Sequence, residues 1–466
     1  MPIARSHPQS RATTESGSPQ NVIYIMADDL GYAELGCYGQ AKIKTPNIDA
    51  LAKRGMRFSQ HYTSAPVCAP ARCSLMTGKH GGHSYVRDNF RIGTWESFRG
   101  QLPLPAGTTT VASLFKKRNY ATGGFGKWGL GEASSSGDPL ENGFDRFFGY
   151  YCQRHAHNYY PRFLIDDGKE RTLEGNDRGV TGKTYAPKVI ADEMLKFVRQ
   201  QHDAKRPFFL YYASVLPHLA LQVPDEELAA YDFEDKPYKG KSYQPHDRPR
   251  AAYAAMISFL DKQVGRLVAT LEELGIQDDT LILFTSDNGT THVAQQVDAK
   301  FFESVGKLRG LKGSMYEGGI RVPLIAVWPG HVAPGSTSDL ISAHYDTMAT
   351  VADLLGVEAP PNDGISYLPT LVGKPESQVV HERLIWDFAG YGGQIAIRAG
   401  KYKLVVRNLV KKPDSKPELY DLESDPSEQH DLADELPDLT ASMHEQLIAE
   451  RQEPETEAFR FGEYAK

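Results

Sequence analysis

Short runs of apolar residues, each bounded by polar or turn-forming residues, constrain the fold of this chain more than any other feature. The clearest run covers residues 22–26 and stops just before Asp28 and Asp29. An uninterrupted apolar run of this length is typical of a strand that is buried on both faces, as in a parallel sheet. Similar runs lie at residues 208–212, 281–284 and 323–328.

Helical patterns separate these runs. Over residues 252–274, apolar side chains recur at steps of three and four, and Gly275 supplies a stop. Thr45 and Pro46 open a shorter helix, with Thr45 as its N-cap, which ends before Gly55. Strands that alternate with helices predict an α/β sheet with helices on both faces. Ligands of such sheets bind beyond the carboxyl ends of the strands.

The pattern changes near residue 379. Short alternating segments at 394–398 and 402–406, followed by a charged helical segment near 438–450, predict a small antiparallel sheet with a closing helix. A chain of 466 residues also exceeds what one hydrophobic core usually organises. We therefore expect a disordered leader or tail over residues 1–20, a large domain over 21–378 and a C-terminal α+β subdomain over 379–466.

Composition and charge exclude several classes of protein. A formal net charge of -7 provides no basic surface for nucleic acid. No segment reaches the roughly 18 apolar residues of a membrane span, so we expect no membrane partner. Residues 1–20 lack the apolar run of a signal peptide. We expect a cytoplasmic protein, or a periplasmic or secreted one if a leader was removed.

Polar groups gather where three of the predicted elements end. Asp28 and Asp29 follow one strand, Asp287 and Asn288 follow another, and Cys68 lies in a loop between helices. Carboxylate and amide oxygens suit calcium or magnesium, although an Asp pair at a strand end is also typical of a turn or a helix cap.

The segment around Cys68 predicts an anion site. Pro70 can start a helix whose amino end points toward Cys68, where an anion would meet free backbone N–H groups. Arg72 adds a planar, permanently charged fork for an oxyanion. A buried cysteine beside a helix start is the alternative interpretation.

Three motifs carry a family resemblance. Residues 68–72 resemble the C-x-P-x-R core of the type I sulfatase signature, which residues 73–80 continue. Residues 126–131 resemble a second signature, and Lys312 ahead of residues 317–323 resembles a third. The resemblance implies an alkaline phosphatase-like fold: a large mixed sheet sandwiched by helices, with a smaller C-terminal domain of antiparallel sheet plus helix. Residues 21–378 would then form the catalytic domain.

The resemblance also implies a mechanism. A formylglycine-generating maturation enzyme would convert Cys68 to formylglycine, whose hydrate is the nucleophile that takes up sulfate and then expels it. Arg72, Lys127 and Lys312 would hold the sulfate and the diol, and His218 would face the leaving oxygen. The implied ligands of calcium, or of magnesium as the other candidate, are Asp28, Asp29, Asp287, Asn288 and the modified Cys68.

Two loops rich in polar and aromatic residues, 83–89 and 152–160, resemble those of bacterial polysaccharide sulfatases. They favour a sulfated sugar as substrate, although polar surface loops are the alternative interpretation. Our candidate substrate-binding residues are Arg87, Arg154, His155, His157 and His292.

Gly129 departs from the second signature, which usually has a histidine there that contacts the formylglycine hydroxyl. Another histidine, His155, His157 or His292, could reach the same hydroxyl, or sulfate release could depend on the metal and water. Two other functions remain open: hydrolysis of phosphonate monoesters or phosphodiesters, and a carbohydrate-binding pseudoenzyme.

Overall fold

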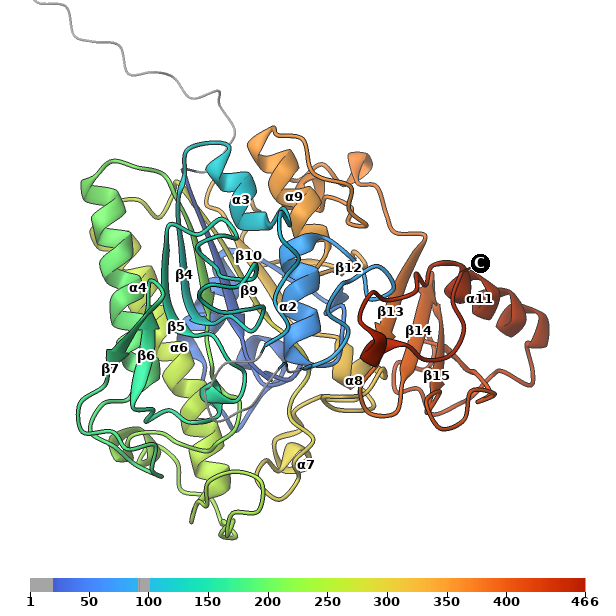
Figure 1. Cartoon of the computed structure of the whole chain (residues 1–466), viewed down its shortest axis with the longest axis horizontal. Helices are drawn as coiled ribbons and strands as arrows, with labels where there is room; N and C mark the ends of the chain where they lie inside the picture. The colour runs from blue at the N-terminus through green and yellow to red at the C-terminus, as the bar shows by residue number, and fades with distance from the viewer. Residues whose placement is uncertain (1–19, 91, 93–100, 466) are drawn as a thin grey trace, which may run out of the picture.

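The computed structural model describes residues 20–90, 92 and 101–465, and the predicted leader 1–20 lies outside this range except for Gln20. A sheet of ten strands forms the body of the molecule, in the order β11-β2-β10-β9-β1-β8-β4-β5-β6-β7 (Figure 1). Its strands are β1 (Asn21–Ala27), β2 (Met56–Phe58), β4 (Ala121–Lys127), β5 (Arg146–Tyr150), β6 (Phe163–Asp166), β7 (Lys169–Thr172), β8 (Phe208–Ala213), β9 (Thr280–Ser286), β10 (Leu324–Val327) and β11 (Ser336–Ser338).

The central strands of this sheet are parallel and end at the same level. β1 pairs with β8 on one side and with β9 on the other, and Ala27 lies opposite Ser286. The residues that follow β1 and β9 therefore meet at one edge of the sheet. β10 runs antiparallel to both β9 and β2, which makes the sheet mixed, as predicted.

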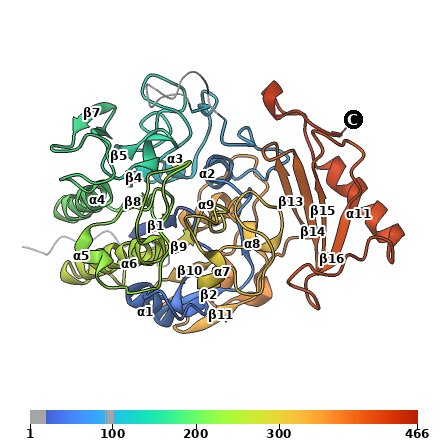
Figure 2. The ribbon, with the colours of Figure 1, turned by 90° about the horizontal axis from the view of Figure 1, so that it is seen from below.

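Helices cover both faces of the sheet because successive side chains of β1 point to opposite sides. Ile23 and Ile25 belong to the apolar core that contains α1, α4 and α6, whereas Val22 and Tyr24 belong to the core that contains α2, α3 and α9. Figure 2 shows these two helical layers on either side of the strands. The helices are α1 (Pro46–Arg54), α2 (Cys68–Thr77), α3 (Val111–Lys116), α4 (Ala186–Asp203), α5 (Asp225–Leu228), α6 (Pro249–Glu273), α7 (Ala299–Phe302), α8 (Glu317–Ile320), α9 (Asp346–Leu355) and α10 (Leu368–Leu371).

Helix starts depart from the sequence-based expectations in two places. α2 begins at Cys68 itself, so Cys68 is the first residue of a helix and the prediction that it lies in a loop was wrong. Thr45 precedes α1 as predicted, but its side chain makes no cap hydrogen bond. The Thr45 hydroxyl instead accepts from the Gly36 N–H at 2.9 Å, which joins the helix start to the preceding turn.

A second, antiparallel sheet lies beside the large one near the C-terminus (Figure 1). One face of the antiparallel sheet packs against Tyr62 and Met315, which precede this sheet in the chain, and the other face packs against α11. Among the described residues, no helix is long and apolar enough to cross a membrane. The other strands and the last α-helix of the described residues are β3 (His61–Tyr62), β12 (Ser342–Ala343), β13 (Arg383–Phe388), β14 (Gln394–Ala399), β15 (Tyr402–Arg407), β16 (Glu418–Asp421) and α11 (Pro437–Ala449).

Candidate active site

The carboxyl ends of β1, β9 and β4 bring polar side chains together at one edge of the sheet, with β8 between β1 and β4. Asp28 and Asp29 follow β1, Asp287 and Asn288 follow β9, and Lys127 is the last residue of β4. All five side chains are buried. Asp29 adopts a left-handed backbone conformation with φ 66°, and its N–H donates to Asp287 Oδ1 at 3.0 Å. This sharp turn directs the two aspartates toward the first residue of α2.

Cys68 lies at the centre of these groups. Its Sγ is 3.3 Å from Asp28 Oδ1 and 3.4 Å from Lys312 Nζ. Burial raises the pKa of the Cys68 thiol well above its ordinary value, and the carboxylate of Asp28 acts in the same direction. The unmodified thiol is therefore held in its neutral form, which is a poor nucleophile.

Three buried ion pairs surround Cys68 and leave the site with equal numbers of positive and negative side chains. Burial alone would lower the pKa of Lys312, but the carboxylate of Asp29 raises it well above its ordinary value. The Arg72 guanidinium is also fixed by a bond from Nη1 to the Lys127 carbonyl at 2.8 Å. The pairs are Lys127 Nζ–Asp28 Oδ2 at 2.7 Å, Lys312 Nζ–Asp29 Oδ1 at 2.6 Å and Arg72 Nη2–Asp287 Oδ2 at 2.8 Å. We call these six residues with Cys68 and Asn288 the Cys68 cluster.

The donor set of the Cys68 cluster fits a hard divalent cation. Asn288 donates from Nδ2 to Asp29 Oδ1 at 2.8 Å, whereas its Oδ1 is buried and has no hydrogen-bond partner among the described residues. A buried acceptor of this kind needs a partner. Ligand atoms of Asp28, Asp29, Cys68 and His218 also lie within 4.8 Å of one another. Several carboxylates and one amide oxygen are the ligands that calcium and magnesium prefer.

His218 lies at the edge of the cluster, with Nε2 3.6 Å from Asp29 Oδ2. Its Nδ1 is 2.5 Å from the Leu219 carbonyl, and because a carbonyl can only accept, Nδ1 carries the hydrogen. Burial lowers the pKa of His218 well below its ordinary value, and Lys312 and Lys127 add to this effect. The ring is therefore neutral, and Nε2 is an acceptor.

The amino end of α2 offers fewer free donors than the sequence suggests. The Ala69 N–H donates to Asn89 Oδ1 at 2.8 Å, and the Ala71 N–H is 3.3 Å from the Val67 carbonyl. Pro70 has no N–H. Side-chain cations rather than backbone N–H groups therefore supply most of the positive charge beside Cys68.

Two of the candidate substrate-binding residues, Arg87 and His155, are held away from the Cys68 cluster by other partners, whereas burial lowers the pKa of a third, His292, and Lys312 and Asp29 of the cluster also act on it. Arg87 is buried, and its guanidinium bonds to Asp387 at 3.0 Å and to the carbonyls of Ser84, Gly82 and Gln452. His155 packs between the rings of Tyr150 and Phe163, where burial lowers its pKa to about 3. His292 lies edge-on to Tyr391, with ring centroids 5.4 Å apart.

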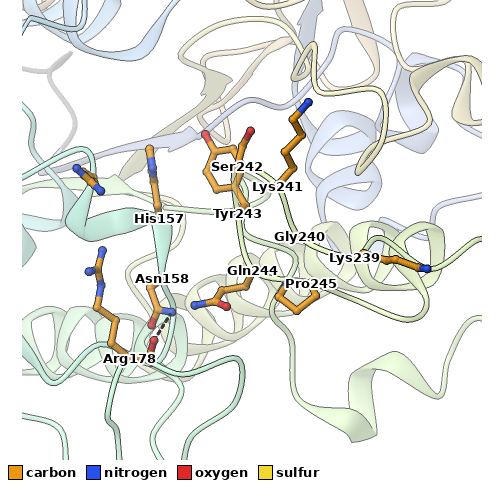
Figure 3. Close-up of a pocket in the computed structure, with 11 residues that line it drawn as sticks. His157, Asn158, Arg178, Lys239, Gly240, Lys241, Ser242, Tyr243, Gln244 and Pro245 are labelled. Atoms are coloured by element: carbon orange, nitrogen blue, oxygen red, sulfur yellow. Dashed lines mark hydrogen bonds between the residues drawn. The ribbon is translucent and has the colours of Figure 1, made fainter.

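The other two candidates, Arg154 and His157, line a pocket of about 410 Å³ (Figure 3). The His157 ring stacks on His218 with centroids 4.7 Å apart, which connects the pocket to the Cys68 cluster. The sequence reasoning missed Arg178 and the segment 239–245, which also line this pocket. Nothing in their local pattern distinguishes them from ordinary surface loops.

Gln153 occupies the space beside Gly129. A Cβ atom on Gly129 would lie 1.9 Å from Gln153 Nε2, and the glycine has φ 81°. Gln153 is buried, and both polar atoms of its amide are without hydrogen-bond partners among the described residues. His155 is packed away from this point, so an amide rather than that histidine fills the space where a side chain at position 129 would lie.

Comparison with known proteins identifies the class. The Sulfatase family model matches residues 20–357, and a second model, N-sulphoglucosamine sulphohydrolase C-terminal, matches residues 311–453. This chain belongs to the sulfatase family, and it is a sulfuric ester hydrolase.

The relatives extend over most of the chain. Human arylsulfatase A (Homo sapiens) is 32% identical, with 89% of this chain and 83% of the relative covered. The rat N-acetylgalactosamine-6-sulfatase (Rattus norvegicus) is 29% identical, with 83% and 72% covered. The crystal structure of Ps i-CgsB in complex with k-i-k-neocarrahexaose superimposes with a TM-score of 0.78 at 28% identity, covering 96% of this chain and 95% of that one.

Proposed function

We propose that this sulfatase removes sulfate from a sulfated carbohydrate at the Cys68 cluster, after Cys68 has been converted to formylglycine by a maturation enzyme. The observation that carries the proposal is the position of Cys68 Sγ, 3.3 Å from the carboxylate of Asp28 and 3.4 Å from the ammonium of Lys312. A sulfated sugar is supported by the relatives, which include an N-acetylgalactosamine-6-sulfatase and a structure in complex with k-i-k-neocarrahexaose.

Calcium, with magnesium as the other candidate, would be held by Asp28, Asp29, Asp287, Asn288 and the oxygen of the modified residue 68. Asn288 Oδ1, which has no hydrogen-bond partner in the part of the chain that the structure describes, supports this assignment. When bound, the cation would stabilise negative charge on the nucleophile and lower the pKa of its hydroxyl. The hydrated aldehyde at residue 68 would carry two hydroxyls, of which one is the nucleophile. Loss of a proton from the other hydroxyl would expel sulfate and restore the aldehyde, a route that a cysteine thiol or a serine hydroxyl does not have.

The cations of the chain have separate roles in this proposal. Arg72 is fixed by Asp287 and by the Lys127 carbonyl, so its fork has one orientation toward the sulfate oxygens. Lys127 and Lys312 balance the charge that develops on those oxygens in the transition state. Charges that are already in place need no reorganisation when the reaction occurs, which is why such groups contribute strongly to rate.

Lys312 is the proton donor we propose for the leaving alcohol. Its ammonium carries hydrogens and lies beside Cys68, whereas the Nδ1 hydrogen of His218 is engaged with the Leu219 carbonyl. Nε2 of His218 would accept a hydrogen bond from a substrate hydroxyl and so orient the sugar.

Parallel assays on matched esters test the proposed function. The wild-type protein, produced with a formylglycine-generating enzyme, is expected to hydrolyse a sulfated saccharide and to act weakly on phosphodiesters and phosphonate monoesters. Cys68→Ala is the control and should lose turnover, because it removes the residue that becomes the nucleophile. Faster hydrolysis of the phosphorus esters would contradict the proposal, as would saccharide binding without turnover in fully converted protein.

A further inference from the structure

One aromatic side chain is exposed close to the Cys68 cluster. Tyr391 is 57% exposed, and it is the only Phe, Tyr or Trp with an exposed side chain among the described residues. It lies in the turn between β13 and β14 of the C-terminal sheet. A single exposed apolar side chain is common on protein surfaces, so the position of this ring and the groups around it decide what it can do.

The Tyr391 ring lies against the segment that carries Lys312. A Cβ atom on Gly313 would be 3.3 to 3.4 Å from three atoms of the ring, so the ring packs directly on the residue that follows Lys312. The Gly313 carbonyl accepts from Gln394 Nε2 at 2.8 Å, which joins this segment to β14. Lys312 Nζ in turn is 3.4 Å from Cys68 Sγ. The C-terminal sheet therefore places an aromatic ring next to a member of the Cys68 cluster.

The turn that carries the ring is fixed by backbone hydrogen bonds. Tyr391 has φ 52°, a left-handed conformation that is unfavourable for a residue with a Cβ. The Ala389 N–H donates to the Arg87 carbonyl at 3.1 Å, and the Gly393 N–H donates to the Gly390 carbonyl at 3.1 Å, which closes the turn. A ligand that contacts the ring would therefore lose little binding free energy to the ordering of this turn.

Two polar side chains border the ring. His292 is exposed and lies edge-on to Tyr391, with an interplanar angle of 87°. A Cβ atom on Gly390 would be 2.6 Å from Asp88 Oδ1, so the Asp88 carboxylate packs against the residue before Tyr391. A sugar ring has apolar C–H faces and a rim of hydroxyls. An aromatic face with a carboxylate and an imidazole beside it is complementary to that combination.

The exposure of Tyr391 assigns it to a different sugar from the one that loses sulfate. The side chains of the Cys68 cluster are buried, so the sulfated sugar must lie directly over them to bring its ester to residue 68. Tyr391 lies outside this buried region, where the next sugar of a chain would reach solvent. The Asp88 carboxylate would repel a second sulfate at this point, which favours an uncharged sugar.

We infer that Tyr391, with Asp88 and His292 beside it, binds the uncharged sugar that adjoins the sulfated one. This inference rests on the proposed function, because it takes the Cys68 cluster as the site of hydrolysis. The substrate is therefore an oligosaccharide rather than a monosaccharide sulfate, and Tyr391 is a specificity-determining residue that the C-terminal sheet contributes.

Three matched probes test the inference. One is a monosaccharide sulfate, and the other two are disaccharides in which an uncharged sugar is linked to either side of the same sulfated sugar. In wild-type protein, KM should be about tenfold lower for one of the disaccharides than for the monosaccharide, because only that disaccharide reaches the Tyr391 ring. Equal KM values for all three probes would overturn the inference.

Substitution of Tyr391 supplies the second arm. Tyr391→Ala should raise KM about tenfold for the preferred disaccharide and leave the monosaccharide within about twofold, with little change in kcat. Tyr391→Phe keeps the ring and should stay within about twofold of the wild-type protein on both probes. Both variants retain a Cβ at the left-handed position, so the backbone cost is the same.

Val380→Ala is the matched control. It also shortens an exposed apolar side chain, 61% exposed, but Val380 precedes β13 whereas Tyr391 follows it. It should leave KM for both probes unchanged. If Tyr391→Ala raised KM equally for the monosaccharide and the disaccharide, or for neither, Tyr391 would not bind a neighbouring sugar.

Calorimetry separates a failure of the inference from a failure of the proposed function. Binding of the three probes is measured with Cys68→Ala and with Cys68→Ala/Tyr391→Ala, neither of which needs turnover. Tighter binding of one disaccharide that disappears in the double variant supports the sugar contact even if the wild-type protein hydrolyses none of the probes. Equal binding of all three probes by Cys68→Ala overturns the inference even if the wild-type protein hydrolyses each of them.

Discussion

The Cys68 cluster and a second buried charge cluster use the same kinds of side chain in different arrangements. In the second cluster, Lys403 of β15 lies 2.9 Å from both Glu317 of α8 and Glu428. Glu317 also accepts from the Tyr62 hydroxyl at 2.6 Å and lies 3.4 Å from Arg321. Burial raises the pKa of Glu428 to about 7, and Glu317 acts in the same direction. We call these five residues the Glu317 cluster.

The difference between the two clusters lies in where their atoms point. The Glu317 cluster joins α8 and β3 to β15, and so fixes the C-terminal sheet against elements that precede it in the chain. The Cys68 cluster directs its carboxylates and ammonium groups toward one reactive residue and leaves Asn288 Oδ1 without a partner among the described residues. The buried charges of the Glu317 cluster therefore hold parts of the fold together, whereas those of the Cys68 cluster are arranged to bind a ligand. Equivalent substitutions in the two clusters should have opposite consequences.

Lys403→Met should destabilise the protein strongly. It leaves Glu317 and Glu428 buried side by side without the ammonium between them, and breaking a buried pair typically costs about 3–5 kcal/mol. The free energy of unfolding in urea measures this loss, and turnover per folded molecule should stay near the wild-type value. Lys401→Met, an exposed lysine of the preceding turn, is the control and should leave stability unchanged. Normal stability of Lys403→Met would mean that the Glu317 cluster does not hold the sheets together.

Lys127→Met should lower the rate of catalysis more than it lowers the stability of the fold. Loss of one fixed charge that stabilises the transition state typically lowers kcat by about 10²–10³-fold. Arg72 remains 3.8 Å from Asp28, and a bound cation would also compensate that carboxylate, so we expect a smaller stability loss than for Lys403→Met. Steady-state kinetics on a sulfated saccharide gives the measurement. Near-normal kcat would remove Lys127 from the mechanism.

Asn288→Ala should weaken cation binding. It removes the amide oxygen that has no partner among the described residues, and we expect calcium affinity to fall roughly ten- to hundredfold, the range seen for polar groups that support metal sites. Titration calorimetry of metal-free protein with calcium measures the change. Asn288→Asp keeps an oxygen at this position and should retain binding. Identical affinities for the wild-type protein and the alanine variant would show that the ligands are wrong.

Much of this arrangement could be predicted from the sequence. The apolar runs before Asp28 and Asp287 predicted two strands, and ligands of such sheets bind beyond the carboxyl ends of the strands. That the two aspartates share one site was implied by the family resemblance, and the pairing of β1 with β9 is visible only in the structure. The positions of Lys127 and Lys312 came from motif resemblance alone. Local sequence cannot show which distant loop returns to a strand end, because tertiary packing decides it.

Other parts could not be predicted, for identifiable reasons. Cys68 begins α2 directly, so the helix starts two residues earlier than Pro70 suggested. Gln153 lies beside Gly129 only because a glycine has no side chain to fill that space, and the sequence around Gln153 does not predict this contact. Arg87 looked suited to binding substrate, yet it bonds to Asp387 across 300 residues of chain. Such long-range partners are visible only in the folded protein.

Mass spectrometry of the peptide that contains residue 68, combined with turnover measured on the same preparations, tests the central claim most directly. The account predicts that the peptide carries an aldehyde in place of the thiol and that turnover of a sulfated saccharide rises in proportion to the converted fraction. Protein made without the maturation enzyme should retain the Cys68 thiol and be inactive. Full turnover by preparations in which residue 68 is still cysteine would contradict the account.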